Sequence, residues 1–191
     1  MKQYKYILAS GSPRRKELLK GLDIDFEVRL LPDIDESYPN GLSGEEIARC
    51  ISQKKAEAYR NTLADDEVVI TADTIVYLDG MVLGKPADEE DAVRMLKALR
   101  GKTHQVITGV TLLRKDKQHT FSAVSQVRFS NLSDDEIAYY VSNYHPLDKA
   151  GAYGVQEWIG YVGVEHIEGS YFNVMGLPVQ RLYQELKQFV S

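Results

Sequence analysis

The sequence of 191 residues contains one cysteine, Cys50, and lacks any apolar stretch of the length that spans a bilayer. A single cysteine excludes an internal disulfide and is typical of a reducing compartment. The N-terminal segment also lacks the apolar core of a signal peptide. These absences predict a cytoplasmic protein with no membrane partner. Cys50 falls inside a predicted helix and is expected to be a small buried core residue, not a nucleophile.

The sequence also lacks an excess of basic residues. Its 23 Lys and Arg against 28 Asp and Glu give a net charge of −5. Sequence-independent binding of nucleic acid depends on a basic surface that releases counterions, so no nucleic-acid partner is expected. Internal repeats, low-complexity tracts and Pro/Gly/Ser-rich linkers are absent too. With 43% hydrophobic residues, the chain can form a single domain over residues 1–191 without disulfides or structural metal.

Strands and helices alternate along the chain, which predicts an α/β fold, and hairpins among the strands predict a mixed sheet. The predicted strands cover residues 4–9, 25–31, 68–72, 106–114, 120–129 and 159–167, with a hairpin over 76–83. The predicted helices cover residues 13–21, 43–60, 88–101, 133–140 and 177–190.

Local signals support these boundaries. Ser43 and Ser133 each begin the Ser-x-x-Glu pattern of a capping box. The Asp79-Gly80 pair supplies the positive φ angles of a type I′ hairpin turn. The helix after Ser43 is expected to bury Ile47, Ile51 and Ala58 along one face.

The segment over residues 8–15 reads LASGSPRR and carries the strongest chemical signal. Ser12 is a good N-cap and Pro13 suits the first helical position. Arg14 and Arg15 then lie in the first turn, where the helix dipole disfavours cations by roughly 0.3–1 kcal/mol each. A bound anion would reverse that cost, because backbone N–H groups, hydroxyls and guanidinium groups would converge on it. The alternative is a capped helix whose arginines point into water.

Charged residues elsewhere could complete an anion site. Lys55 should emerge near the buried stripe of its helix, and Lys85 lies between Gly84 and Pro86. Asp73 follows the apolar run over 68–72, at a strand end where ligands of α/β sheets collect. Glu36 lies in an acidic loop and is the natural second carboxylate for a hard divalent cation. Each of these four residues, considered alone, could equally be a solvated loop, turn or helix-surface residue without a chemical role.

Electrostatics favours bringing these groups together. Two like charges about 6 Å apart repel by roughly 3 kcal/mol at an effective dielectric constant near 20. A cluster of Arg15, Lys55 and Lys85 therefore needs anions nearby. Asp73 and Glu36 supply two, and a triphosphate supplies more.

Seven segments in one order then resemble the Maf family of nucleotide pyrophosphatases, from the first strand to the terminal helix. They are LASGSPRR (8–15), IDE (34–36), KA (55–56), ADTIV (72–76), GKP (84–86), DKAGAYGVQ (148–156) and GLP (176–178). The resemblance implies a Maf/ITPase-like α/β fold, an elongated mixed sheet with flanking helices and two lobes around a central cleft, often as a homodimer. It also implies Mg²⁺- or Mn²⁺-dependent hydrolysis between the α and β phosphates of a nucleoside triphosphate.

The resemblance further implies residue roles. Asp73 corresponds to the proton acceptor, and Arg15, Lys55 and Lys85 to cations that face phosphate. Glu36 corresponds to a metal-site carboxylate, and Asp73 is expected to share the metal. Ser10 and Ser12 are expected to contact the substrate. The adjacent lysines leave open whether Lys54 or Lys55 faces phosphate.

Substrate choice is implied at three positions. The family branch that acts on dTTP and UTP has arginine, threonine and glutamine there, and this chain has Arg14, Thr74 and Gln156. A glutamine amide offers both a donor and an acceptor, which suits O4 and N3–H of uracil or thymine. Two alternatives stay open: a pyrophosphatase for modified or noncanonical nucleotides, and a non-catalytic nucleotide sensor that regulates cell division.

Overall fold

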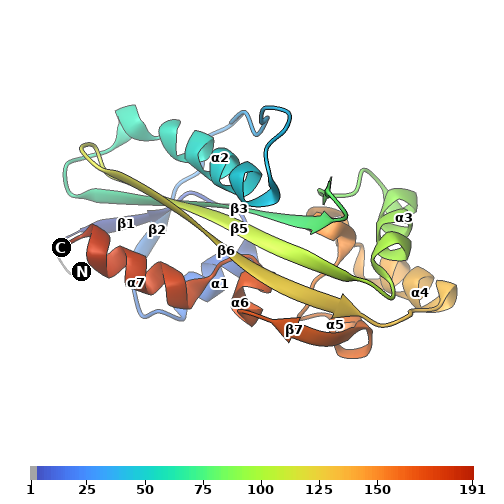
Figure 1. Cartoon of the computed structure of the whole chain (residues 1–191). Helices are drawn as coiled ribbons and strands as arrows, with labels where there is room; N and C mark the ends of the chain where they lie inside the picture. The colour runs from blue at the N-terminus through green and yellow to red at the C-terminus, as the bar shows by residue number, and fades with distance from the viewer. Residues whose placement is uncertain (1–3) are drawn as a thin grey trace. The chain divides into compact units, whose positions relative to one another are not determined.

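The computed structural model describes residues 4–191. Its strands form a mixed sheet in the order β2-β1-β3-β5-β6-β7, with β4 paired to β3 (Figure 1). The strands are β1 Lys5–Leu8, β2 Phe26–Val28, β3 Glu67–Leu78, β4 Met81–Leu83, β5 Thr103–Leu113, β6 Gln118–Phe129 and β7 Val164–Glu168. The helices are α1 Pro13–Lys20, α2 Gly44–Glu57, α3 Glu89–Leu99, α4 Asp134–Tyr144, α5 Trp158–Gly163, α6 Tyr171–Met175 and α7 Val179–Phe189. The 3₁₀ turns are η1 Arg60–Thr62, η2 Pro146–Asp148 and η3 Ala150–Ala152.

The strand directions confirm the predicted mixed sheet with flanking helices. β1 runs parallel to both β2 and β3, whereas β4 pairs antiparallel with β3 and β7 antiparallel with β6. The β3–β4 hairpin turns at Asp79 and Gly80, whose φ angles are 50° and 84°. Positive φ at both positions is what a type I′ turn requires, so the predicted hairpin is confirmed.

The chain divides into two compact units that share strands β3, β5 and β6. The first unit contains the described residues up to Thr74, with Thr108–Ala123 and Gly176–Ser191; the second contains Ile75–Ile107 and Val124–Met175. Within the first unit, α2 covers one face of the strands and α1 and α7 lie on the other (Figure 1). The prediction of a single domain over residues 1–191 stays a prediction.

Each unit has its own apolar core. In the first, Ile7, Val69 and Leu113 of three strands pack with Ala56 and Tyr59. The Tyr59 hydroxyl donates to the Arg29 carbonyl at 2.8 Å and accepts from the Leu31 amide at 3.1 Å, which fixes the start of the acidic loop. In the second, a larger cluster joins α3 and α4 to β5, β6 and the segment over 150–159.

The predicted helix starts at Ser12, Ser43, Asp88 and Ser133 are confirmed. Ser43 and Ser133 both form the reciprocal capping box, and Asp88 accepts from the Asp91 amide. Side-chain caps of this kind stabilise a helix by about 1 kcal/mol each.

Two predictions on α2 were wrong. Cys50 is half-buried and not a buried core residue. Ala58 is exposed, because the helix ends at Glu57 and the chain turns there, and Ala56 is buried in its place.

Two predicted strands also differ from the structure. The strand over 68–72 does not end at Asp73 but continues to Leu78, because Asp73 and Thr74 find polar partners on opposite sides of β3. The predicted strand over 159–167 is helix α5 followed by β7. Its glycines mark a close backbone approach: a Cβ at Gly160 would lie 1.7 Å from the Val155 carbonyl oxygen.

Candidate active site

A lysine between two carboxylates forms the first part of the site. Lys55 Nζ lies 2.7 Å from Asp73 Oδ1 and 3.0 Å from Glu36 Oε1. The Lys55 and Asp73 side chains are 13% and 14% exposed, whereas Glu36 is 57% exposed. Among the described residues, the second oxygen of each carboxylate has no protein partner. Two carboxylates therefore share one lysine, and each keeps one oxygen that can accept a hydrogen bond or bind a metal ion.

Packing of α2 on the sheet places Lys55 there. A Cβ at Gly109 would lie only 2.2 Å from the Ala48 carbonyl oxygen, so glycine is what lets the helix backbone approach β5. On the same side of β3, the Thr71 hydroxyl donates to the Ser52 carbonyl at 2.6 Å. Thr71 and Asp73 are two residues apart and face α2 together, as strand alternation requires.

Arg15 forms the second part of the site, and neutral oxygens surround it. Its Nε donates to the Gly176 carbonyl at 2.8 Å, and Nη1 to the Ala72 carbonyl at 2.9 Å. Nη1 also lies 3.4 Å from Ser10 Oγ, and Nη2 donates to Thr74 Oγ1 at 3.0 Å. Four of the five N–H donors of a guanidinium are thus accounted for, and no carboxylate of residues 4–191 is an ion-pair partner.

The end of β1 makes room for this arginine. The Ala9 amide still donates to the Ile70 carbonyl of β3 at 2.9 Å, but the chain then leaves the sheet to enter α1. The Ala72 carbonyl is the next one on the edge of β3 that faces β1. Because β1 has already ended there, this carbonyl accepts from Arg15 and not from a strand amide. The Arg15 guanidinium thus donates the hydrogen bond that a backbone amide of β1 would have donated if the strand had continued.

The start of α1 supports the predicted anion site. Ser12 Oγ accepts from the Arg15 amide at 3.4 Å, and Ser10 Oγ accepts from the Ser12 amide at 3.3 Å. The first turn contains no acidic residue. Burial lowers the pKa of Arg15, and the negative charge of Asp73 opposes that shift. A half-buried cation near a helix N-terminus, with no ion-pair partner among the described residues, favours an anionic ligand. Arg14, in the same turn, is half-buried.

Lys54 differs from its neighbour. Its Nζ lies 2.8 Å from Asp35 Oδ2 and 3.0 Å from Ser37 Oγ, and Asp35 is 67% exposed. This ion pair and two hydrogen bonds from Ser37 hold the pKa of Asp35 well below its usual value. Lys54 is thus committed to a surface pair, and Lys55 is the lysine that meets Asp73.

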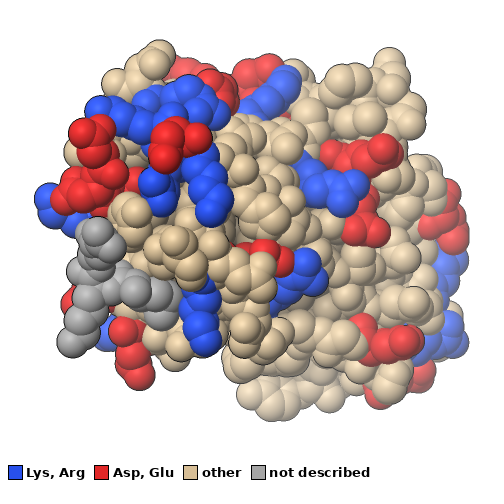
Figure 2. Space-filling model, turned by 60° about the vertical axis from the view of Figure 1, so that its left-hand side comes forward, with Lys and Arg blue, Asp and Glu red and all other residues tan. Residues whose placement is uncertain are grey.

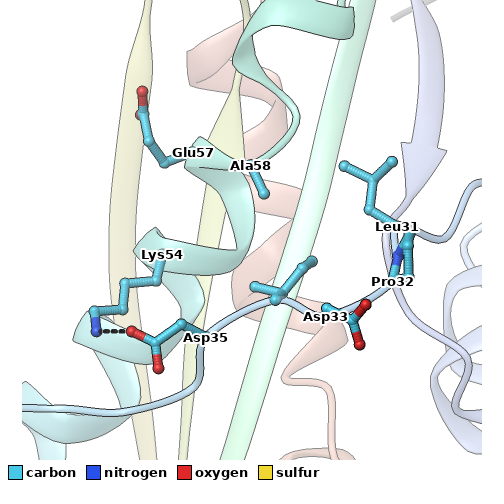
Figure 3. A pocket seen from close by; sticks show the side chains of 8 residues that line it. Leu31, Pro32, Asp33, Asp35, Lys54, Glu57 and Ala58 are labelled. Carbon is cyan, nitrogen blue, oxygen red and sulfur yellow. Dashed lines mark hydrogen bonds and ion pairs between the residues drawn. The ribbon is translucent and has the colours of Figure 1, made fainter.

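A pocket of about 600 Å³ lies beside that pair (Figure 3). Its lining residues are Leu31, Pro32, Asp33, Ile34, Asp35, Lys54, Glu57 and Ala58. The pocket lies between the acidic loop and the C-terminal end of α2, and its lining includes none of the predicted site residues.

The second unit contains the remaining predicted residues. Lys85 is exposed, and Gln156 is half-buried with its Oε1 accepting no hydrogen bond from the described residues. A Cβ at Gly154 would lie 3.1 Å from Gln156 Nε2, so the absence of a side chain makes room for this amide.

A second lysine–dicarboxylate cluster lies in the same segment. Lys149, whose side chain is 9% exposed, has its Nζ 2.7 Å from Asp148 Oδ1 and 3.1 Å from Glu157 Oε1. The Tyr140 hydroxyl donates to Glu157 and accepts from the Gly154 amide at 3.0 Å. Burial and the hydrogen bond to Glu157 raise the pKa of Tyr140.

Most other ion pairs are on the surface. Basic and acidic side chains are interspersed over the face that Figure 2 shows. Lys97 and Arg100 both pair with Asp134, which is 60% exposed, and exposed pairs of this kind contribute roughly 0–1 kcal/mol. Low exposure is what separates Lys55 from this background.

Within residues 4–191, no three His, Cys, Asp or Glu side chains form a group that could hold a metal ion. Helices long and apolar enough to cross a membrane do not occur in this part of the chain. A metal ion at Asp73 and Glu36 would have only two protein carboxylates, which is a number that Mg²⁺ accepts because it keeps several waters.

The fold and this cluster define an α/β protein with a candidate polyphosphate site. Residues 5–189 match the family model described as "Maf-like protein", and the chain belongs to this family. It is 63% identical over 188 residues to a Phocaeicola vulgatus protein named dTTP/UTP pyrophosphatase, covering 98% of this chain and 97% of that protein. A Bacteroides fragilis protein of the same name is 61% identical over 186 residues, covering 97% and 96%.

A solved structure supports the fold. The Staphylococcus aureus Ham1 protein covers 98% of this chain and is itself fully covered, with a TM-score of 0.55 at 16% identity. At that identity the likeness extends to the fold and not to the chemistry.

Sequence reasoning missed three groups at these clusters. The Gly176 carbonyl and Thr108, which lies 2.9 Å from Thr74 through its hydroxyl, belong to the Arg15 cluster. Glu157 holds Lys149. A backbone carbonyl leaves no trace in side-chain patterns, and a buried threonine in an apolar strand has no distinguishing signal. Gly176 does belong to the GLP segment (176–178), which resembles the family, and this is the signal that pointed to its place near the site.

Proposed function

We propose that this protein hydrolyses dTTP and UTP to the nucleoside monophosphate and diphosphate. The observation that carries the proposal is Lys55 held between Asp73 and Glu36, beside a helix start that favours anions. The choice of dTTP and UTP as substrates is supported by membership of the family and by two relatives named dTTP/UTP pyrophosphatase.

Asp73 is proposed as the proton acceptor. One of its oxygens accepts from Lys55 at 2.7 Å, which orients the carboxylate and leaves the other oxygen for a water molecule. That water attacks the phosphoanhydride between the α and β phosphates, its proton passes to Asp73, and diphosphate departs. Positioned general bases of this kind contribute about 10²–10⁴-fold to a rate.

The cations have distinct proposed roles. Arg15 and Lys55 offset negative charge on the phosphates, and Lys85 is proposed to face the departing diphosphate on the resemblance alone. Glu36 would hold a Mg²⁺ or Mn²⁺ ion through its remaining oxygen, and Asp73 would share the ion through the lone pair of its free oxygen that does not face the water. When bound, the ion would supply charge neutralisation on the phosphate oxygens.

Base choice is proposed to depend on Arg14, Thr74 and Gln156, with Ser10 and Ser12 on the phosphates. Support for Gln156 comes from its buried, unsatisfied Oε1, since buried acceptors normally have partners. The amide suits the donor and acceptor edge of a pyrimidine. A higher kcat/KM for GTP than for UTP and dTTP would remove this assignment.

The decisive experiment measures diphosphate and monophosphate release from UTP and dTTP with Mg²⁺ and with Mn²⁺. Asp73→Asn should lose about 10²–10⁴-fold in kcat. Asp35→Asn is the matched control, because Asp35 is a nearby carboxylate paired with the other lysine, and it should keep wild-type turnover. Equal turnover by Asp73→Asn and wild type would remove Asp73 from the central role.

The proposal also includes that the protein forms a homodimer and that it is located in the cytoplasm. Light scattering at several protein concentrations measures the mass, and a constant monomer mass would contradict it.

A further inference from the structure

The Thr74 hydroxyl is fully committed to protein partners. Its Oγ1 lies 3.0 Å from Arg15 Nη2, 2.9 Å from Thr108 Oγ1 and 3.3 Å from the Gly176 carbonyl oxygen. A hydroxyl has one donor and two acceptor positions. Arg15 can only donate and Gly176 can only accept, which leaves Thr108 to donate to the second acceptor position. Every hydrogen-bonding position of Thr74 is then used.

Thr108 therefore sets the direction in which the Thr74 hydroxyl points. Thr108 lies on β5, is fully buried, and lies next to Thr74 across the β3–β5 pair. With Thr108 donating, the Thr74 proton is directed to Gly176 and the remaining lone pair to Arg15. Without that donor the Thr74 hydroxyl can rotate, and Arg15 Nη2 loses a fixed acceptor.

The geometry matters because Arg15 depends on such acceptors. It is a half-buried cation without an ion-pair partner among the described carboxylates, and its donors meet two carbonyls and two hydroxyls. Four fixed contacts leave one N–H of Nη2 to point elsewhere. A guanidinium fixed in this way presents its charge in one orientation, which is the preorganisation that charge stabilisation needs.

We propose that Thr108 is a positioning residue that acts through the Thr74 hydroxyl to fix Arg15 for the phosphate groups of the substrate. This inference rests on the proposed function, because its effect is read in nucleotide hydrolysis. It also gives Thr74 a role through Arg15 and not by direct contact with the base.

The experiment compares Thr108→Val with Thr111→Val. Valine keeps the shape of threonine and removes its hydroxyl. Thr111 is the matched control, because it is equally buried on β5 and joins a hydroxyl pair with Ser52 at 3.0 Å that does not include Arg15. Thr108→Val should lower kcat/KM for UTP roughly 10-fold through kcat, since hydrogen bonds that serve a charged group are the stronger ones. Thr111→Val should stay within about twofold.

Two further variants separate positioning from packing. Thr108→Ser restores the hydroxyl and should return kcat/KM to within about threefold of wild type. In a Thr74→Val background, Thr108→Val should have no additional effect, because the hydroxyl through which it acts is gone. Equal kinetics for Thr108→Val and Thr111→Val, no rescue by serine, or additive losses in the double variant would each overturn the inference.

These measurements distinguish a failure of the positioning role of Thr108 from a failure of the proposed pyrophosphatase function. If wild type releases no diphosphate from UTP or dTTP with either metal, the proposed function fails. If wild type turns over normally and Thr108→Val does too, only the positioning role fails.

Discussion

Two lysines in this protein each lie between two carboxylates, and their distances are nearly the same. Lys55 has oxygens at 2.7 and 3.0 Å, and Lys149 has oxygens at 2.7 and 3.1 Å. Both side chains are largely buried, at 13% and 9% exposure. Lysine geometry alone therefore does not separate a chemical site from a structural one.

The difference lies in what surrounds the acids. Glu157 also accepts from the Tyr140 hydroxyl, which in turn accepts from the Gly154 amide, so the cluster around Lys149 ties α4 to the segment before α5. Among the described residues, the Asp73 and Glu36 carboxylates make no hydrogen bond or ion pair other than those with Lys55. A network in which the acids are further bonded holds a fold together, whereas one with spare oxygens can bind a ligand.

The largest expected effect is on activity at Lys55. Lys55→Met should lower kcat/KM for UTP about 10²–10³-fold, the usual cost of removing one charge-stabilising group. Its unfolding free energy should fall as well, because Asp73 is only 14% exposed and would lose its cation. Steady-state kinetics and urea unfolding measure the two quantities.

The adjacent lysine gives the control. Lys54→Met removes an exposed ion pair from the same helix and should leave kcat/KM within about threefold of wild type. Equal losses from the two variants would show that helix charge, and not the Asp73 contact, matters.

The second effect is on stability at Lys149. Lys149→Met leaves Glu157, which is 21% exposed, without its cation, and breaking a largely buried pair costs about 3 kcal/mol. Lys97→Met removes a pair with Asp134 that is 60% exposed, and should cost under about 1 kcal/mol. Urea unfolding of both variants tests this, and a smaller loss at Lys149 than at Lys97 would contradict the structural role.

The pH dependence of stability sharpens the comparison, because a buried histidine contacts the Lys149 segment. His104 is 2% exposed, its Nε2 lies 2.7 Å from the Tyr153 hydroxyl oxygen, and burial lowers its pKa from 6.5 to about 4. The unfolded chain binds this proton more readily than the folded one. Stability is thus complete above pH 6.5 and falls as the pH drops toward 4.

From pH 7.5 to pH 5 the loss attributable to His104 should be about 2 kcal/mol. Urea unfolding as a function of pH measures it. His104→Gln, which stays neutral, should remove this part of the slope. His166→Gln, at an exposed position, should keep it. An unchanged slope in His104→Gln would show that other groups produce the acid sensitivity.

The sequence predicted the elements whose signals are local. Capping serines, the Asp79-Gly80 turn and apolar runs fix helix starts and hairpins through contacts a few residues apart. It failed where tertiary packing decides: Gly160 forms a close approach inside a helix, and Asp73 continues a strand because α2 supplies Lys55. Strand extensions and close backbone approaches of this kind depend on packing that local sequence patterns do not record.

The site shows the same division. Lys55 and Asp73 were predicted as members of one site, and the structure places their side chains 2.7 Å apart, while their roles stay predictions. Thr108 and the Gly176 carbonyl could not be predicted, because their importance comes from distances to Arg15 and Thr74 across the fold. The roles of Lys85 and Gln156 stay predictions.

The smallest expected effect concerns the space that Gly154 leaves. A Cβ there would lie 2.9 Å from Glu157 Cδ and 3.0 Å from Lys149 Cε, so Gly154→Ala presses on the structural cluster. Both neighbours are ends of flexible side chains, which keeps the cost near about 1 kcal/mol, the low end for overpacking. Gly84→Ala, with nothing within 4 Å of its Cβ, should be neutral in the same unfolding measurement. If both variants were neutral, the Lys149 cluster would be as adaptable as the one around Lys55, and the contrast between a fixed and an open cluster would no longer hold.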